Sequence, residues 1–531
     1  ISSTMSTFFR YATTPSTSQS RGGIFSTANT LSSNDSKNET LTGSWLWMRS
    51  ETSSNDLRVN YTRGKFESSS IMDNFGGATP LDPARIFPTG VNTSSGTFNL
   101  QINGLGGYSL GQGSVNQQRQ INIVDAYSHT SGTHQYKMGL DYRRLTPTYT
   151  QRPYSSNFTF NGLGSGESGS FLSGFASNAI VSSNPIDTEP MYQNFSAYWQ
   201  DTWKLTDRTT FTYGARWDVN PAPTSRTSLK PLALTADNTL TQDKPLYSTR
   251  YYNISPRFGV AYMLDNTPDK EMMFRGGIGI FYDIGYGSSN AAFTGAPYSN
   301  VRLITSPSFP LSNANLAAPG LPAKEPYGQV NGADYGLLAP RITQWQMTVE
   351  RYFGRAQSLE LGYVGTAGRR MATQETRTVF SETATTFNDA TLLRLTTNGA
   401  TSDYHGLNVQ YRRRFSNNFQ TQINYTWSHA IDSASNDFGG GFQLFATNNR
   451  GNSNFDIRHN FNASGSYKLP GTGNTWLKPL TNYWWADFIV TSRSGIPFDI
   501  QSQSAAPSTA SGSTSRIGFF GQGRPNYNGK P

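Results

Sequence analysis

Apolar and polar side chains alternate along many short segments of this chain. In residues 419–429, FQTQINYTWSH, the odd positions from Phe419 to Trp427 carry rings, an isoleucine and a threonine, and the positions between them carry amides and hydroxyls. Successive side chains of a strand point to opposite faces, so the segment predicts a strand with one ring-rich face and one polar face. The solvent on each face decides between a soluble sheet and a barrel that spans a membrane.

The same alternation recurs in residues 55–66, 134–144 and 209–218. Each segment is about ten residues long, the length that a tilted strand needs to cross a bilayer. Short connectors rich in Gly, Asn, Asp or Ser join such segments into hairpins. The predicted strand pairs are 38–49/55–66, 118–129/134–145, 193–204/209–219, 253–264/270–282, 341–353/356–366, 403–414/419–430 and 456–468/483–494, and a further strand lies near 3–12.

The connections between these pairs are long and rich in Gly, Pro, Ser, Thr and Asn. They cover residues 67–117, 146–192, 220–252, 283–340, 367–402 and 431–455. Short turns at one end and long loops at the other are typical of a barrel in an outer membrane, where the long loops are extracellular. A soluble sandwich has no reason to keep all of its long loops at one end. The pattern therefore predicts an all-β fold, a large transmembrane antiparallel up-and-down β-barrel.

The number of predicted strands is odd. About fifteen strands are expected, whereas bacterial single-chain barrels have an even number. An open edge in lipid would leave backbone groups unpaired. We therefore expect residues 1–531 to form part of a barrel domain whose remaining strands lie outside this chain.

Composition narrows the possible classes further. The chain has 531 residues, 35% hydrophobic and 13% aromatic, with no cysteine. No stretch approaches the roughly 18–20 consecutive apolar residues of a membrane helix, and the lack of cysteine excludes disulfides and thiol chemistry. The net charge of +9 does not indicate nucleic-acid binding, because Lys and Arg are scattered and the densest run, residues 412–414, lies at a strand end.

The chemical motifs favour structural interpretations over cofactor or metal sites. The glycine-rich run 275–287, RGGIGIFYDIGYG, continues as a strand and lacks the helix that a phosphate loop requires. The histidines are dispersed, without the spacing of a metal site, and the loop carboxylates match no calcium loop. Residues 167–179 have apolar positions at roughly helical spacing and predict a short helix in an outer loop. We expect no catalytic residue, cofactor or metal.

The polar faces of the predicted strands carry charges that would line a wet lumen. They would form a permeation path or, preferably, a surface on which a plug docks. The lumen-facing candidates are Arg58, Lys137, Asp141, Arg143, Arg216, Asp218, Arg275, Glu350, Glu360, Arg412 and Arg458. Tryptophans within or near the strands suit aromatic girdles at the two membrane interfaces. The girdle candidates are Trp45, Trp47, Trp199, Trp203, Trp217, Trp345, Trp427, Trp484 and Trp485.

The order and spacing of several segments resemble a known family. They include AYWQDTWKLTDRTTFTYGARWD (197–218), ISPRFGVAYM (254–263), FRGGIGIFYD (274–283), TQWQMTVERYFGRAQSLELGYVGTAGRRM (343–371), FDIRHNFNASGSYKLP (455–470) and FIVTSRSGIPF (488–498). The chain resembles the barrel portion of TonB-dependent outer-membrane receptors of the Oar-like group. The resemblance implies about twenty-two strands, a plug domain and a TonB box, and neither the plug nor the box is visible in this sequence.

The resemblance implies a transporter or receptor in the outer membrane of a Gram-negative bacterium. A plug would gate the uptake or export of a bulky, unidentified solute, and a TonB-type inner-membrane complex would supply the energy. The expected partners are outer-membrane lipid, the plug and that complex, and we expect no enzyme activity. One alternative is a barrel that anchors adhesive or secretion-related surface loops, and another is a soluble multidomain β-protein such as a lectin or propeller.

Overall fold

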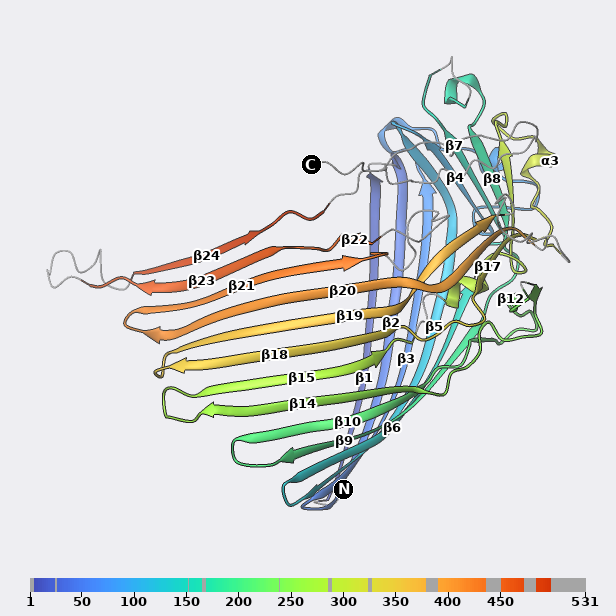
Figure 1. Cartoon of the computed structure of the whole chain (residues 1–531). Coiled ribbons are helices and arrows are strands. Elements are labelled where there is room, and N and C mark those ends of the chain that lie inside the picture. The colour runs from blue at the N-terminus through green and yellow to red at the C-terminus, as the bar shows by residue number, and fades with distance from the viewer. Residues whose placement is uncertain are drawn as a thin grey trace, which may run out of the picture.

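Long antiparallel strands dominate the computed structural model of the chain (Figure 1). The structure describes residues 4–23, 26–150, 152–164, 169–237, 239–284, 289–322, 327–378, 390–435, 450–471 and 484–497. Fifteen long strands run through these residues, as the alternating segments predict. They are β1 (Met5–Gly23), β2 (Ser26–Ser50), β3 (Ser53–Met72), β5 (Gly106–Ser131), β6 (His134–Thr150), β9 (Pro190–Lys204), β10 (Thr209–Val219), β14 (Asn253–Asp265), β15 (Met272–Tyr282), β18 (Arg341–Phe353), β19 (Gln357–Thr378), β20 (Ala390–Ser416), β21 (Phe419–Asp432), β23 (His459–Lys468) and β24 (Trp485–Arg493).

Each long strand pairs antiparallel with the next one along the chain, from β1 to β24. Figure 1 shows the resulting sheet as one continuous curved wall, with blue β1 at one edge and red β24 at the other. In the described residues β1 pairs only with β2, and β24 only with β23. The predicted all-β, up-and-down architecture is therefore confirmed.

The two ends of the wall differ in the length of their connections. At one end the strands are joined by tight turns, as between Ser50 and Ser53, Ser131 and His134, or Ser416 and Phe419. At the other end most of the connections are long and carry their own strands and short helices (Figure 1). We call these the periplasmic and the outer end.

Several strands extend much further toward the outer end than the alternation predicts. β2 begins at Ser26 rather than near residue 38, and it pairs with β1 as far as Gly23 and Ser26. β5, β19 and β20 likewise enter the predicted loops 67–117 and 367–402. The extension of β2, STANTLSSNDSK (26–37), is almost entirely polar, whereas that of β20 buries Leu393 and Leu395. The backbone ladder rather than an apolar face holds the extension of β2, so periodicity does not reveal it.

Parts of the predicted loops also form a branch of the same sheet at the outer end. Its strands are β4 (Gly96–Ile102), β7 (Tyr154–Phe160), β8 (Asn178–Ser183) and β16 (Asn300–Thr305). β4 pairs antiparallel with the outer part of β5 and parallel with β7, and β7–β8–β16 continue antiparallel. Loop stretches that are distant in sequence thus build one folded unit, the outer cap. The connections 67–117, 146–192 and 283–340 are rich in Gly, Pro, Ser, Thr and Asn, so their sequences do not reveal this unit.

A dry core holds the outer cap together. Phe98, Phe158 and Phe160 are buried on one face of β4 and β7, and Val181 of β8 joins them. The expected helix in 167–179 is, in its described part, a single 3₁₀ turn, η2 (Phe171–Ser173). The Phe171 and Phe160 rings pack edge to face with their centroids 5.1 Å apart, so Phe171 is part of the core of the outer cap.

The remaining elements also lie within the outer connections. β17 (Tyr327–Ala333) pairs parallel with β20, and Val330 of β17 belongs to a second apolar cluster with Leu232, Leu234 and Leu240. The others are η1 (Phe75–Gly77), α1 (Pro83–Ile86), β11 (Thr224–Ser225), β12 (Ala233–Leu234), β13 (Leu240–Thr241), η3 (Ala291–Phe293), α3 (Asn313–Leu316) and β22 (Gly451–Asn452). Much of the predicted connection 431–455 lies outside the described residues. No helix of the described chain is long and apolar enough to span a membrane.

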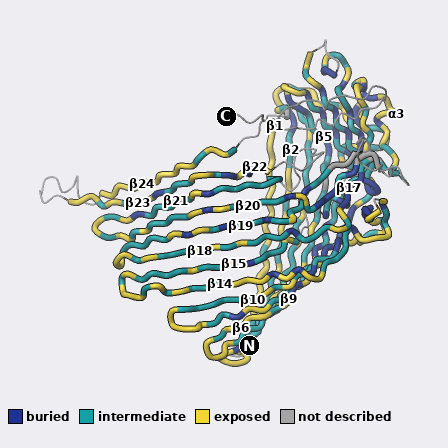
Figure 2. The backbone as a smooth tube through the Cα atoms, in the orientation of Figure 1, coloured by how far each residue is buried: buried dark blue, intermediate teal, exposed yellow. Residues whose placement is uncertain are grey.

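The ring-rich face of the wall is uncovered. Fully buried residues gather at the outer end, whereas most of the wall is intermediate or exposed (Figure 2). Exposed apolar side chains recur on neighbouring strands, with Leu140 on β6, Ile278 on β15, Met347 on β18 and Trp427 on β21. A soluble sheet would cover such a face with a second layer, so this belt suits contact with lipid.

The predicted girdle tryptophans are spread along the periplasmic part of the wall. Trp217, Trp345 and Trp427 each lie eight residues from the periplasmic end of their strand, and Trp45 and Trp199 lie five residues or fewer from theirs. The remaining candidates, Trp47, Trp203, Trp484 and Trp485, are closer to the periplasmic turns. Their role as girdles at the two interfaces stays a prediction.

An ion pair ties the outer ends of β1 and β3 together. Arg21 donates from Nη1 and Nη2 to the two oxygens of Asp73 at 2.7 and 2.6 Å. These hydrogen bonds hold the pKa of the Asp73 carboxyl below its ordinary value. The stabilisation is therefore present above the ordinary carboxyl pKa and is lost as the pH falls through the lowered pKa.

We expect acid to loosen this corner before it affects the wall. The measurement is amide hydrogen exchange at Asp73, whose N–H donates to the Asn29 carbonyl at 3.0 Å. Its protection should fall at low pH in the parent protein. In Asp73→Asn the protection should be low and independent of pH, and equal pH profiles in the two proteins would contradict the role of the pair.

Candidate functional site

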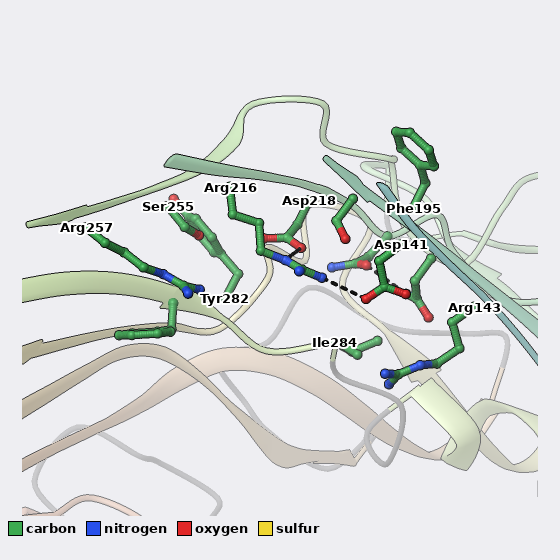
Figure 3. Close-up of a pocket in the computed structure, with 13 residues that line it drawn as sticks. Asp141, Arg143, Phe195, Arg216, Asp218, Ser255, Arg257, Tyr282 and Ile284 are labelled. Atoms are coloured by element: carbon green, nitrogen blue, oxygen red, sulfur yellow. Dashed lines mark hydrogen bonds and ion pairs between the residues drawn. The ribbon is translucent and has the colours of Figure 1, made fainter. Parts of the chain in front are cut away.

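The polar face of the wall gathers charged and polar side chains on β6, β9, β10 and β14. Asp141 of β6 and Asp218 of β10 both lie directly opposite Ser196 of β9, which separates them. Arg216 lies opposite Ser255 of β14. Alternation places all of these side chains on the face away from the rings, and the antiparallel register aligns them in neighbouring rows. Separate strands therefore build one lumenal charge cluster (Figure 3).

Arg216 is the centre of this cluster. Its Nε donates to Asp218 Oδ1 at 2.9 Å, and its Nη2 donates to Asp141 Oδ2 at 3.2 Å. Asn122 donates to the other oxygen of Asp141 at 2.7 Å. The two carboxylates are 20% exposed or less, so removing the guanidinium between them would leave two poorly hydrated like charges close together. The Arg216 hub therefore fixes the wall locally.

Other polar groups around the hub are not satisfied by the described chain. Ser255 is 1% exposed and its Oγ has no hydrogen-bond partner, nor has the buried Nε of Arg143. Arg257 lies over the Phe281 ring at 4.4 Å without an ion pair in the described residues. These groups line a cavity of about 120 Å³ (Figure 3). Buried polar groups normally have partners, so the cavity is suited to a polar group supplied from the lumen.

The structure thus brings four of the predicted lumenal residues together, Asp141, Arg143, Arg216 and Asp218. Sequence reasoning missed Ser255 and Arg257, which share this cavity. A signal was present, because Ser255 and Arg257 alternate with Ile254 and Phe258 in ISPRF. Their membership in the cluster depends on the pairing of β14 with β10, which one strand does not reveal.

The other predicted lumenal residues lie elsewhere. Near the periplasmic end Arg275 donates to Glu350 at 3.3 Å, and Glu350 lies opposite Glu360. Arg412, on the next strand, lies opposite Ser358. Arg58 pairs with Asp56 at 2.5 Å, and Lys137 lies opposite Ser128 and Gln200. These positions share the lumenal face but do not reach the cavity.

Arg458 lies at the outer end of the wall, next to the end of β21. It precedes β23, and its guanidinium contacts Asp456 at 3.0 Å and His429 Nε2 at 2.9 Å. The His429 ring shares the face of Trp427, two residues away on β21. The Ser428 N–H donates to the Arg458 carbonyl at 3.0 Å, and the lumenal position of Arg458 stays a prediction.

The structure shows no metal centre in its described residues, where no three histidine or acidic side chains are grouped to hold an ion. Of the dispersed histidines, His405 and His429 lie directly opposite each other. They turn to different partners, because His405 bonds the Tyr363 hydroxyl at 2.7 Å and His429 bonds Asp456 at 3.1 Å. The pair therefore serves the outer end of β19–β21 as hydrogen-bonded side chains.

Comparisons with known proteins support the barrel fold of the chain. The sequence model of a family described as Outer membrane beta barrel domain matches residues 1–531. The structure is similar to that of the outer membrane transporter YddB from Escherichia coli, with a TM-score of 0.54 and 10% identity over 93% of this chain and 59% of that chain. The ferric-catecholate import receptor Fiu from E. coli K12 in its closed form gives 0.47 and 10% identity over 88% and 60%. The chain thus covers less than two thirds of either protein, and no protein with curated annotation matches it.

Proposed function

The chain belongs to the family of outer membrane beta barrel domains and lies in the bacterial outer membrane, and from this premise we propose that it forms the wall of a plug-gated transporter for a bulky solute. The outer cap and its neighbouring loops capture the solute. A plug inside the lumen then rearranges when a TonB-type inner-membrane complex pulls on it. The transport needs no bond to be made or broken by the chain.

The cavity beside the Arg216 hub carries this proposal. A wall that only anchored surface loops would need no unsatisfied polar groups on its inner face, because each of them costs stability. Arg143, Ser255 and Arg257 offer donors to an acceptor in the lumen. We assign the cavity to plug docking in preference to direct contact with the solute, because a plug fills the lumen along its whole wall.

The test compares a deletion strain with a strain that carries the full-length gene. Mass spectrometry of spent medium is expected to show a solute depleted only by the complemented strain, and depletion should stop when the proton gradient is collapsed. The double variant Arg143→Gln/Arg257→Gln should slow depletion about tenfold, the effect of one lost charge-assisted hydrogen bond. The control is Arg58→Gln, also lumenal, whose side chain is 65% exposed and pairs only with Asp56 in the described residues.

Two results would contradict transport by this protein. The first is that the spent media of the two strains are the same. The second is that depletion continues without the proton gradient. If depletion occurs but the cavity variant behaves like Arg58→Gln, transport stands and the assignment of the cavity to docking is wrong.

The outer cap favours a second candidate function, the display of an adhesive surface. Leu105, Leu163 and Leu172 are exposed in turns at the far end of the cap, where backbone bonds join Leu163 to Leu172 and Asn103 to Phe160. Exposed apolar side chains in a well-packed unit mark contact sites for other molecules. Loss of cell adhesion in the deletion strain, without a change in the spent medium, would select this function.

A further inference from the structure

Three arginines lie side by side on the ring-rich face of the wall. Arg63 of β3 is directly opposite Arg119 of β5. On the next strand, Arg144 of β6 lies opposite Ile121 and is therefore the diagonal neighbour of Arg119. Directly opposite residues have Cβ atoms about 5 Å apart, and diagonal neighbours lie within about 8 Å. We call these three residues the arginine triad.

The arginine triad stands at the level of the outer headgroups. Arg63 lies ten residues after Ser53, where β3 leaves its periplasmic turn, and Arg144 lies ten residues after His134, where β6 does so. A tilted strand crosses the hydrocarbon layer in about 9–11 residues. Below the triad, Val59 and Ile123 lie opposite each other in the exposed apolar belt. The three guanidiniums thus lie just above the hydrocarbon.

The described chain leaves this group short of negative charge. The carboxylate nearest to Arg63 is Glu39 at 4.0 Å, and Lys37 holds the same side chain at 2.8 Å. Arg119 donates to the neutral side chain of Gln117. In the described residues neither Arg119 nor Arg144 forms an ion pair. Like charges directly opposite each other destabilise a sheet, so an anion between these strands would relieve the repulsion.

We propose that the arginine triad binds the phosphate of a lipid headgroup in the outer leaflet. Guanidinium groups bind phosphate through paired, charge-assisted hydrogen bonds. The acyl chains of the same lipid descend along Ile121 and Ile123, whose side chains are exposed on this face. Soluble phosphate could bind the guanidinium groups but has no acyl chains to pack against Ile121 and Ile123, so the site selects a lipid.

The experiment measures lipid retention by the full-length protein purified in detergent from its own membrane. Lipid A and its dephosphorylated form are offered in mixed micelles, and bound lipid is counted by mass spectrometry. The parent protein should retain the phosphorylated form preferentially. Arg119→Gln/Arg144→Gln should weaken that retention about 30-fold, as expected for two cations each worth about fivefold at a membrane surface.

The control removes two arginines at the periplasmic turns, Arg208→Gln/Arg355→Gln, and should retain lipid as the parent does. Heat-modifiable gel migration reports whether each variant is folded. If the double variant does not fold, Arg144→Gln alone carries the test, because its side chain is exposed and has no ion pair in the described residues. Equal retention by triad and control variants, or release of the lipid by an equal concentration of inorganic phosphate, would overturn the proposal.

Discussion

Replacing Met347 by arginine is expected to destabilise the wall in a bilayer by about 2–4 kcal/mol, the cost of a cation on the lipid face near the membrane midplane. Met347 is 54% exposed and lies six residues from Phe353, the periplasmic end of β18. Its neighbours across the strands are Gly276 and Tyr363, and the belt residues Ile278 and Leu361 lie beside them on the same face. The arginine would therefore meet hydrocarbon rather than water.

The adjacent residue provides the matched control. Gln346 is exposed on the opposite face, so its side chain points into the lumen. Gln346→Arg should change the free energy of unfolding by less than about 0.5 kcal/mol, as for an ordinary hydrated surface position. Both variants are unfolded in urea from lipid vesicles, with tryptophan fluorescence as the signal. Equal effects at the two positions would mean that lipid does not cover the ring-rich face.

The alternation of side chains was sufficient to predict the strands that cross the membrane. In FQTQINYTWSH the pattern is strong, because each face meets a different solvent, and β21 occupies that segment. It fails for the outer half of β2, which is polar on nearly every position. In the cap, the alternate burial of Phe98, Leu100 and Ile102 in β4 leaves only a short trace of a strand.

The candidate site was predictable as a set of side chains but not as a cluster. Alternation placed Asp141, Arg216 and Asp218 on the polar face. Which charges meet depends on how far each strand is shifted against its neighbour, and a one-residue slip would send every side chain to the other face. The place of Arg257 in the cluster depends on that register, which the sequence of a single strand does not reveal.

Arg216→Gln is expected to lower the free energy of unfolding by about 2 kcal/mol. Breaking a fully buried ion pair costs about 3–5 kcal/mol, and the 30% exposure of the Arg216 side chain reduces that cost through solvent screening. Glutamine can donate to one of the two carboxylates but cannot neutralise both. The measurement is urea unfolding in detergent micelles, again followed by tryptophan fluorescence.

The physical reason for the loss can be separated from the loss itself. If the repulsion between Asp141 and Asp218 dominates, adding Asp218→Asn to Arg216→Gln should recover more than half of the lost stability, because the pair is then no longer two like charges. Arg58→Gln is the control, since the Arg58–Asp56 pair is on the same face but largely hydrated and should cost less than about 1 kcal/mol. A loss no larger than in Arg58→Gln would show that the hub does not hold the wall. Failure of Asp218→Asn to restore stability would assign the loss to packing of the arginine stem against its strand neighbours.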